Sequence, residues 1–517
     1  KQLTKAKANL KDLNDNKIPA AKAALSPLES TKKDLEKQLA AAQKTQQTCQ
    51  ADQATLKDKN DKTKAENDAW VAKVKELIQT NPAQASEEAA QLLKGKNKKN
   101  TDLLTAIGQA YLEAGKISEA ETYAALGQKA DSKSAAVSVL QGDIAVAKKE
   151  AGKACQLYEQ AIYFDPNYKE AYLKFADVYK PASPQLAIEK LEQLKSIDPS
   201  SVAADKKLAE IYYLNNKFDK AAEAYARFIN TPEATEDDLT KYSFALFLNH
   251  DFEKSLQIAL MGLQKNPRDA AFNRLAMYNY TDLKRYDEAM KAADAFFKES
   301  DKADFSYLDY MYFGHLLNAV KKYDQAVDAY MQAITLDPSK TDLWREVSSS
   351  YELNNEFTKA IEAYKKYSES LSADKRTPDV QFQIGKLYYE KGTQSDTLTV
   401  SLDERRAALL SADSIFTEIA TVAPDSYLGN FWRARTNSAL DPETTQGLAK
   451  PYYEEVVTFL VDKNDPRYNS ALIECYSYLG YYYLVANKLP ESKEYWNKIL
   501  AIDPANATAK RALDGIK

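Results

Sequence analysis

Apolar side chains recur at helical intervals along most of this chain, and residues 307–338 show the pattern most clearly. Small and large residues alternate there at steps of three and four, which place them on one face of a helix. The stretch predicts two short helices packed against each other, with Gly314 and Ala326 where the backbones approach and Tyr330 filling the gap. Asp337-Pro338 ends the second helix, because the residue before a proline is pushed out of the helical region. The pattern is formed by Tyr310, Phe313, Gly314, Leu317, Ala326, Tyr330 and Ala333.

The same pattern returns thirty-four residues later. A period of 34 with large, small, tyrosine, alanine and proline landmarks resembles the tetratricopeptide repeat. This resemblance implies an array of antiparallel helix pairs, each burying its apolar stripe against its neighbours. The second unit contains Thr341, Trp344, Val347, Ser348, Tyr351, Ala360, Tyr364 and Tyr367.

Further units with these landmarks fill residues 101–504, and residues 505–517 predict a short helix that caps the last pair. The ninth unit carries an insertion at 392–406, which is helix-like from about Leu402. Long links between repeat helices often carry binding residues, although a tolerated insertion would look the same. We expect an all-α protein, a right-handed superhelical solenoid of about eleven helix pairs.

The first 69 residues form a different segment, rich in Lys, Ala, Gln, Asn and Asp and without aromatic residues. Pro19 and Pro27 are expected to interrupt it, and a long polar helix is expected from Ser30 onward. Positions at heptad spacing are apolar only at the two ends of this helix, which argues against a strong coiled coil. The segment is either a spacer or self-association arm, or a solvated extension. Residues 70–100 predict a degenerate helix pair and a basic linker.

The resemblance also implies a partner surface on the concave side, where the first helices of the repeats expose one face. Apolar side chains there would contact an extended or helical segment of another protein. The alternatives are a groove filled by the chain's own N-terminal helix, or an uneven solvated surface. The candidate partner-binding residues are Lys206, Tyr213, Phe244, Phe247, Met311, His315, Arg345, Phe382, Lys386, Tyr389 and Tyr481.

One subclass of the family holds a C-terminal carboxylate with Lys, Asn and Arg on successive first helices. This chain lacks that set, because Glu210 stands where Lys206 would need an asparagine neighbour. Asn273 has the required amide, but it stands without the other two residues of the set. Carboxylate-clamp binding is therefore not expected.

Catalytic chemistry has little support in the sequence. There is no phosphate-binding glycine loop, no HExxH and no GxSxG, so we expect no enzyme, no cofactor and no metal site. The net charge of −5 argues against a general nucleic-acid binder. His315 is expected to be structural or solvated, and Cys155 and Cys475 to be plain packing residues rather than a disulfide.

These features predict a non-catalytic scaffold or adaptor that binds protein segments, within a larger envelope-associated assembly. A chaperone for unfolded envelope proteins and a regulatory subunit that tethers an enzyme are the alternatives. The residue usage and the start at Lys1 are similar in style to exported repeat proteins of Bacteroidota. A removed leader would explain that start, and so would a trimmed sequence. We expect a periplasmic location, with the cytoplasm as the alternative, and no direct membrane span.

Overall fold

The computed structural model describes residues 2–301, 303–395 and 400–516, and these residues form helices joined by short turns, without strands. The chain divides into two compact units, one ending at Lys217 and one beginning at Phe218. This division falls between the helices Val202–Leu214 and Phe218–Phe228. None of the described helices is long and apolar enough to cross a membrane.

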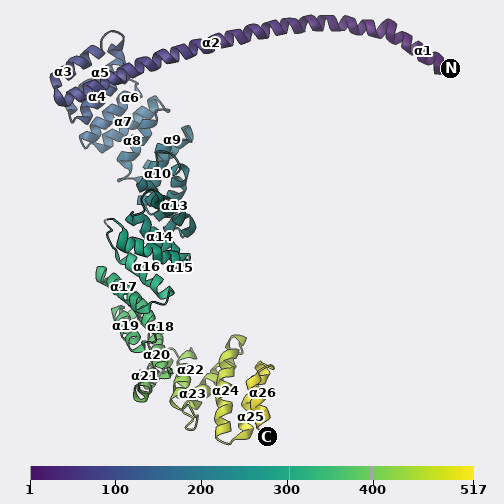
Figure 1. Ribbon diagram of the computed structural model, residues 1–517, viewed down its shortest axis with the longest axis vertical. Coiled ribbons are helices and arrows are strands. Elements are labelled where there is room, and N and C mark those ends of the chain that lie inside the picture. The colour runs from purple at the N-terminus through teal and green to yellow at the C-terminus, as the bar shows by residue number, and fades with distance from the viewer. Residues whose placement is uncertain (1, 302, 396–399, 517) are drawn as a thin grey trace. The chain divides into compact units, whose positions relative to one another are not determined.

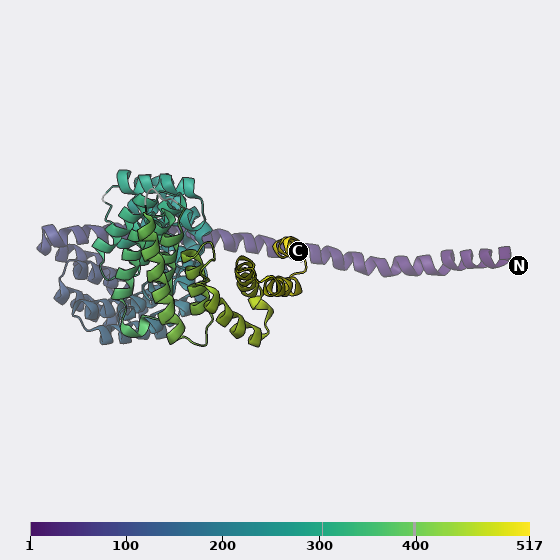
Figure 2. The ribbon, with the colours of Figure 1, turned by 90° about the horizontal axis from the view of Figure 1, so that it is seen from below.

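The first unit begins with α1 (Gln2–Asp12), a π-helical turn at Leu13–Lys17 and the long helix α2 (Ile18–Thr80). Figures 1 and 2 show this helix projecting away from the helices that follow it. The expected interruption at Pro27 is wrong, because α2 continues through it. A proline inside a helix removes one backbone hydrogen bond. Here the helix is exposed, so water can satisfy the carbonyl that loses its partner.

The last turns of α2 pack against α3 (Pro82–Leu92) and form the helix pair expected at residues 70–100. Val74, Ile78, Ala85 and Ala89 are buried between them. The Trp70 indole donates a hydrogen bond of 2.9 Å to Glu88, which also pairs with Lys73. The unit continues through α4 (Thr101–Glu113), α5 (Ile117–Ala130), α6 (Ala135–Ala147), α7 (Ala151–Phe164), α8 (Lys169–Tyr179), α9 (Pro184–Ile197) and α10 (Val202–Leu214).

The second unit contains the remaining helices of the array. As expected, α21 begins at Leu402. The C-terminal helix α26 packs on α25 through Ala509, which is buried. The helices are α11 (Phe218–Phe228), α12 (Glu236–Leu248), α13 (Phe252–Lys265), α14 (Ala270–Asp282), α15 (Tyr286–Asp294), α16 (Tyr307–Ala319), α17 (Tyr323–Leu336), α18 (Leu343–Leu353), α19 (Phe357–Ser370), α20 (Pro378–Thr393), α21 (Leu402–Val422), α22 (Leu428–Leu440), α23 (Lys450–Lys463), α24 (Asn469–Val485), α25 (Leu489–Ile502) and α26 (Ala507–Gly515).

The two helices of a repeat pack through a small residue on the first and a large residue on the second. The expected partners Gly314 and Tyr330 are in contact, and Tyr330 is fully buried. Repeat five replaces this arrangement with Ser243 and Ser255, whose hydroxyls each donate to the other residue's carbonyl oxygen at 2.8 and 2.7 Å. A buried hydroxyl must find a partner, and this exchange satisfies both.

The cysteines are all free thiols, and two of them pack in the core as expected. Cys155 lies in the interior of the first unit and Cys475 in that of the second. Burial raises the pKa of the Cys155 thiol to about 11, which keeps it protonated at neutral pH. Cys49 is exposed on α2.

Candidate protein-binding surfaces

The first unit exposes a hollow of about 510 Å³ along the same face of successive first helices. Helices α4, α6 and α8 provide its walls, and Lys64 of α2 lies at its edge. The floor is apolar, with Val139 and Leu140, while the rim carries charges. The residues that line the hollow include Asp102, Thr105, Gln109, Val139, Asp143 and Lys174.

Asp143 organises the charged side of this hollow. It accepts hydrogen bonds from the Tyr158 hydroxyl at 2.7 Å and from the Lys174 ammonium at 3.0 Å. Burial lowers the pKa of Lys174, but the interaction with Asp143 outweighs it and the net pKa is raised. Lys174 is therefore a cation held in place beside the apolar floor, where it can meet a carboxylate of a partner.

Sequence reasoning missed this hollow, although the signal was available. The predicted groove residues lie three residues before, and one and four residues after, the small residue at which each first helix packs on its partner. Around Gly314, for example, these are Met311, His315 and Asn318. Applied to Gly108, that rule gives Thr105, Gln109 and Leu112, and applied to Gly142 it gives Val139, Asp143 and Val146. Four of these six residues line the hollow, namely Thr105, Gln109, Val139 and Asp143.

In the second unit, the prediction that Phe247 is uncovered is wrong. Phe247 is 6% exposed and packs against Phe252, Tyr278 and Tyr312, with ring centroids 5.5–5.8 Å apart. Tyr278 and Tyr312 belong to the next two first helices, which the pattern of a single helix does not reveal. Phe244 stays half-buried beside it, with a centroid distance of 6.2 Å.

His315 and Asp309 both belong to α16 but have different surroundings, and His315 lies between the rings of Tyr312 and Tyr330. Its imidazole is 5.6 Å from the Tyr330 ring centroid and its Nε2 is 3.8 Å from a carboxylate oxygen of Glu346. Burial lowers the pKa of His315, although Glu346 and Asp282 act in the opposite direction. Asp309 is instead fully buried and binds Arg274, the Tyr278 hydroxyl and Ser306.

An aromatic cluster lies farther along, where α20 and α22 expose their faces. Tyr389 and Phe382 meet the Trp432 ring nearly edge-on, at centroid distances of 5.3 and 5.4 Å. All three rings are half-buried. The Arg435 guanidinium lies 4.9 Å from the Trp432 ring centroid and forms two hydrogen bonds of 2.7 and 2.6 Å to Glu474. We call Phe382, Tyr389, Trp432 and Arg435 the aromatic cluster.

The other predicted residues are placed as follows. Lys386 pairs with Glu352 at 3.3 Å and with Glu390 at 3.1 Å. Burial lowers its pKa, but the two carboxylates outweigh this and raise it. Arg345 is exposed and lies over Tyr367, while Met311 is half-buried and Tyr481 is 44% exposed. In the first unit, Lys206 and Tyr213 are half-buried on α10.

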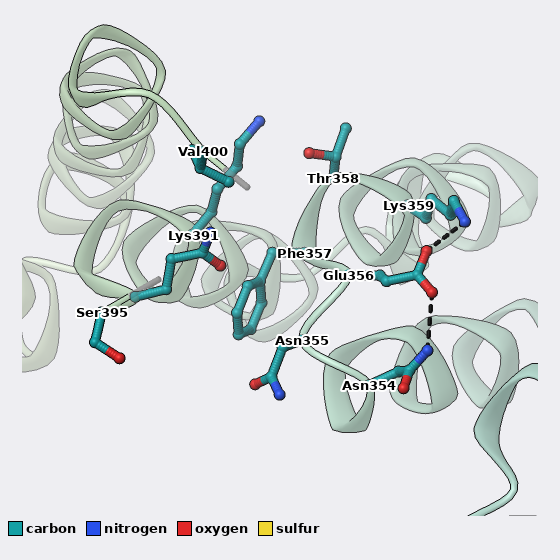
Figure 3. Close-up of a pocket in the computed structure, with 10 residues that line it drawn as sticks. Asn354, Asn355, Glu356, Phe357, Thr358, Lys359, Lys391, Ser395 and Val400 are labelled. Carbon is teal, nitrogen blue, oxygen red and sulfur yellow. Dashed lines mark hydrogen bonds and ion pairs between the residues drawn. The ribbon is translucent and has the colours of Figure 1, made fainter. Parts of the chain in front are cut away.

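A separate hollow of about 580 Å³ lies beside the insertion of repeat nine. Figure 3 shows the Phe357 ring between Asn355 and Lys391, with Ser395 at the rim. Glu356 is engaged by Lys359 and by Asn354, the latter at 2.8 Å. Part of the insertion, residues 396–399, lies outside the described residues, so a binding role for it stays a prediction.

The described residues contain no group of His, Cys, Asp and Glu side chains that could hold a metal ion. In both units the first helices present ion pairs beside apolar side chains, which are aliphatic in the hollow of the first unit and aromatic in the cluster of the second. The fold and these surfaces define an all-α repeat protein of the protein-binding kind.

Comparison with known proteins identifies the repeat. Tetratricopeptide-repeat family models match residues 105–169, 207–233 and 309–374. The matched segments lie in both units, and each of them contains tetratricopeptide repeats.

Two solved structures from bacteria are similar to parts of the chain. One is the C-terminal part of a repeat-containing protein from Cytophaga hutchinsonii, 27% identical, covering 53% of this chain and 99% of that one, with a TM-score of 0.43. The other is a tetratricopeptide-repeat protein from Parabacteroides merdae, 15% identical, covering 55% and 98%, with a TM-score of 0.27.

Among curated proteins, a peroxisomal targeting signal receptor of Candida albicans is 26% identical over 218 residues. That match covers 41% of this chain. The chain spans about a third of the length of this relative, 31%.

Proposed function

We propose that this protein is a non-catalytic scaffold that binds a segment of a partner protein along the first-helix face of its array. The observation that supports the proposal most directly is the aromatic cluster. Three aromatic rings there keep part of their surface exposed, beside a guanidinium already fixed by Glu474. Half-exposed aromatic rings and arginine are the side chains that contribute most to protein interfaces.

The test replaces side chains of this face that are exposed, Arg345 and Tyr481, or half-buried, Tyr389, and leaves the buried side chains in place. In the groove variant, Arg345, Tyr389 and Tyr481 become serine, and Phe247 is left intact because it is buried. The control variant changes three exposed apolar residues of second helices to serine, namely Met331, Val422 and Val461. Both variants should keep their helicity and melting temperature.

Each protein is purified from its own cells under mild conditions, and the bound proteins are quantified by mass spectrometry. The proposal predicts one or two partners at constant ratio with the wild type and the control, and at least tenfold less with the groove variant. Equal recovery with both variants would place binding elsewhere.

The two alternatives give different outcomes. A chaperone would hold many clients weakly and would slow aggregation of an unfolded model protein, with the groove variant failing to do so. A regulatory subunit would recover one enzyme at fixed ratio. The envelope-associated, periplasmic location also remains a proposal, and fractionation of the native cells with a periplasmic marker enzyme tests it.

A further inference from the structure

An apolar stripe runs along the N-terminal part of the long helix. Eight leucine and isoleucine side chains project from it, each between 42% and 73% exposed. A monomeric soluble protein rarely leaves so long an apolar patch uncovered. The side chains of this stripe are Leu3, Leu10, Leu13, Ile18, Leu25, Leu28, Leu35 and Leu39.

The spacing of the stripe breaks once, and the helix geometry absorbs the break. Steps of seven residues join Leu3 to Leu10 and Ile18 to Leu25, whereas Leu10 to Ile18 is a step of eight. The π-helical turn Leu13–Lys17 lies inside that step. A π turn accommodates one extra residue, so the stripe continues on the same face. A helix that had only to be soluble would need no such continuity.

We propose that this stripe pairs with the same stripe of a second copy of the chain, in antiparallel orientation. Under one twofold axis near residue 20, Leu3 faces Leu35 of the second copy and Leu10 faces Leu28. Ile18 faces Ala21. The stripe is therefore complementary to itself, as a twofold interface requires.

Charge favours the antiparallel orientation over the parallel one. Lys32 occupies a position within the stripe, and a parallel in-register pair would place it against its own copy. The antiparallel pair places Lys32 beside the small Ala6, where its stem can extend to water. It also brings Lys7 beside Glu29, whereas a parallel pair would bring Lys17 beside Lys22.

The segment that follows sets the limit of the pairing. Beyond Leu39, one row of the heptad pattern becomes polar with Gln46 and Gln53. Cys49 lies on the other row and is exposed. In a parallel pair the two Cys49 thiols would face each other, whereas in the antiparallel pair they are far apart.

The first experiment measures mass by light scattering of the full chain at micromolar concentration. The wild type is expected at twice 58.0 kDa. Leu28→Lys should shift it to the monomer mass, and Ser30→Lys, which adds the same charge two residues away and off the stripe, should not. Because both sites are exposed on α2, neither substitution should affect folding. A monomeric wild type, or equal behaviour of the two variants, would overturn the proposal.

The second experiment tests orientation in a Cys49→Ser background, in which the remaining cysteines are buried. Leu10→Cys and Leu28→Cys are prepared as separate proteins and oxidised alone and as a mixture. Antiparallel pairing predicts a covalent dimer only in the mixture. Cross-linking of each protein with itself would show parallel pairing and overturn the orientation, as would rapid formation of a Cys49 disulfide in the wild type. No cross-link in any sample would overturn the pairing itself.

Discussion

Gly314 lies against the ring of Tyr330, and a Cβ built on it would be 2.5 Å from the nearest ring carbon. The same relation recurs between Gly142 and Tyr158 at 2.4 Å. Gly480 and Trp496 repeat it at 2.8 Å. Such distances leave no room for a methyl group unless the ring moves, and Tyr330 is fully buried. The absence of one carbon atom therefore sets how closely the two helices of a repeat approach.

Gly314→Ala should destabilise repeat seven by about 1–3 kcal/mol, because overpacking a fixed core forces rings and backbone to shift. Hydrogen exchange of peptides from α16 and α17 measures the effect. Gly152→Ala is the control, since a Cβ there meets nothing within 4 Å. It should leave exchange in α7 unchanged or slow it. Equal effects of the two substitutions would contradict the packing argument.

His315 predicts a pH dependence of stability. Burial lowers its pKa in the folded protein below the ordinary value of 6.5, so the folded state favours the neutral ring. The stabilising contribution is thus complete above the unfolded pKa and is lost as pH falls through the folded pKa. The urea midpoint of the second unit should fall between about pH 7 and about pH 5, and His315→Gln should flatten this dependence. An unchanged slope would assign it to other groups.

The turn between the two helices of a repeat shows the same conformation again and again. One residue of each turn has a left-handed backbone. Its φ is near 60° at Lys149, Asn216, His250 and Lys321. The next backbone N–H then reaches back to the end of the first helix, for example from Lys322 to the Leu317 oxygen at 2.8 Å. This closes the helix end, and it places His250 in a turn rather than in a site.

Lys321 is therefore a position where glycine should be better than any other residue. The free energy of unfolding of Lys321→Gly, measured by urea titration, should be about 1 kcal/mol higher than that of Lys321→Ala, because the Cβ of alanine keeps the left-handed strain. Both variants lose the same charge, so their difference reports the backbone alone. Equal free energies of unfolding would show that the turn relaxes without cost.

Repeats in an array contact mainly their neighbours, and ion pairs between successive first helices reinforce this. Lys174 of α8 pairs with Asp143 of α6, and Lys386 of α20 pairs with Glu352 of α18. Each ion pair therefore joins two neighbouring repeats. Stability in such an array is close to a sum of repeat and neighbour terms. The molecule is expected to unfold in parts rather than in one transition.

Gly142→Ala should accelerate hydrogen exchange in α6 to α8 several-fold and leave α20 to α25 unchanged. Helices α20 to α25, which lie in the other unit of the same protein, serve as the internal control. Uniform acceleration over both units would show a single cooperative unit instead.

The order of helices, their approximate ends and the small and large packing partners follow from the sequence alone. Periodic spacing decides which residues share a face, and a local rule such as Asp337-Pro338 decides where a helix ends. The repeat period then predicts the stacking, because an isolated pair such as Gly314 and Tyr330 cannot cover its own apolar stripe. The structure confirms the helix pairs and the contact between Gly314 and Tyr330, and family models confirm the repeat in three segments of the chain.

Only the tertiary structure decided which side chains of the first-helix face stay exposed. Phe247 has the sequence position of a surface residue but is covered by Tyr278 and Tyr312 from two later helices. Nor does local pattern show that α2 runs through Pro27, or that a π turn keeps Leu10 and Ile18 on one face. Exposure and register along a helix depend on what packs beside it and on backbone geometry summed over many residues, and a local pattern contains neither.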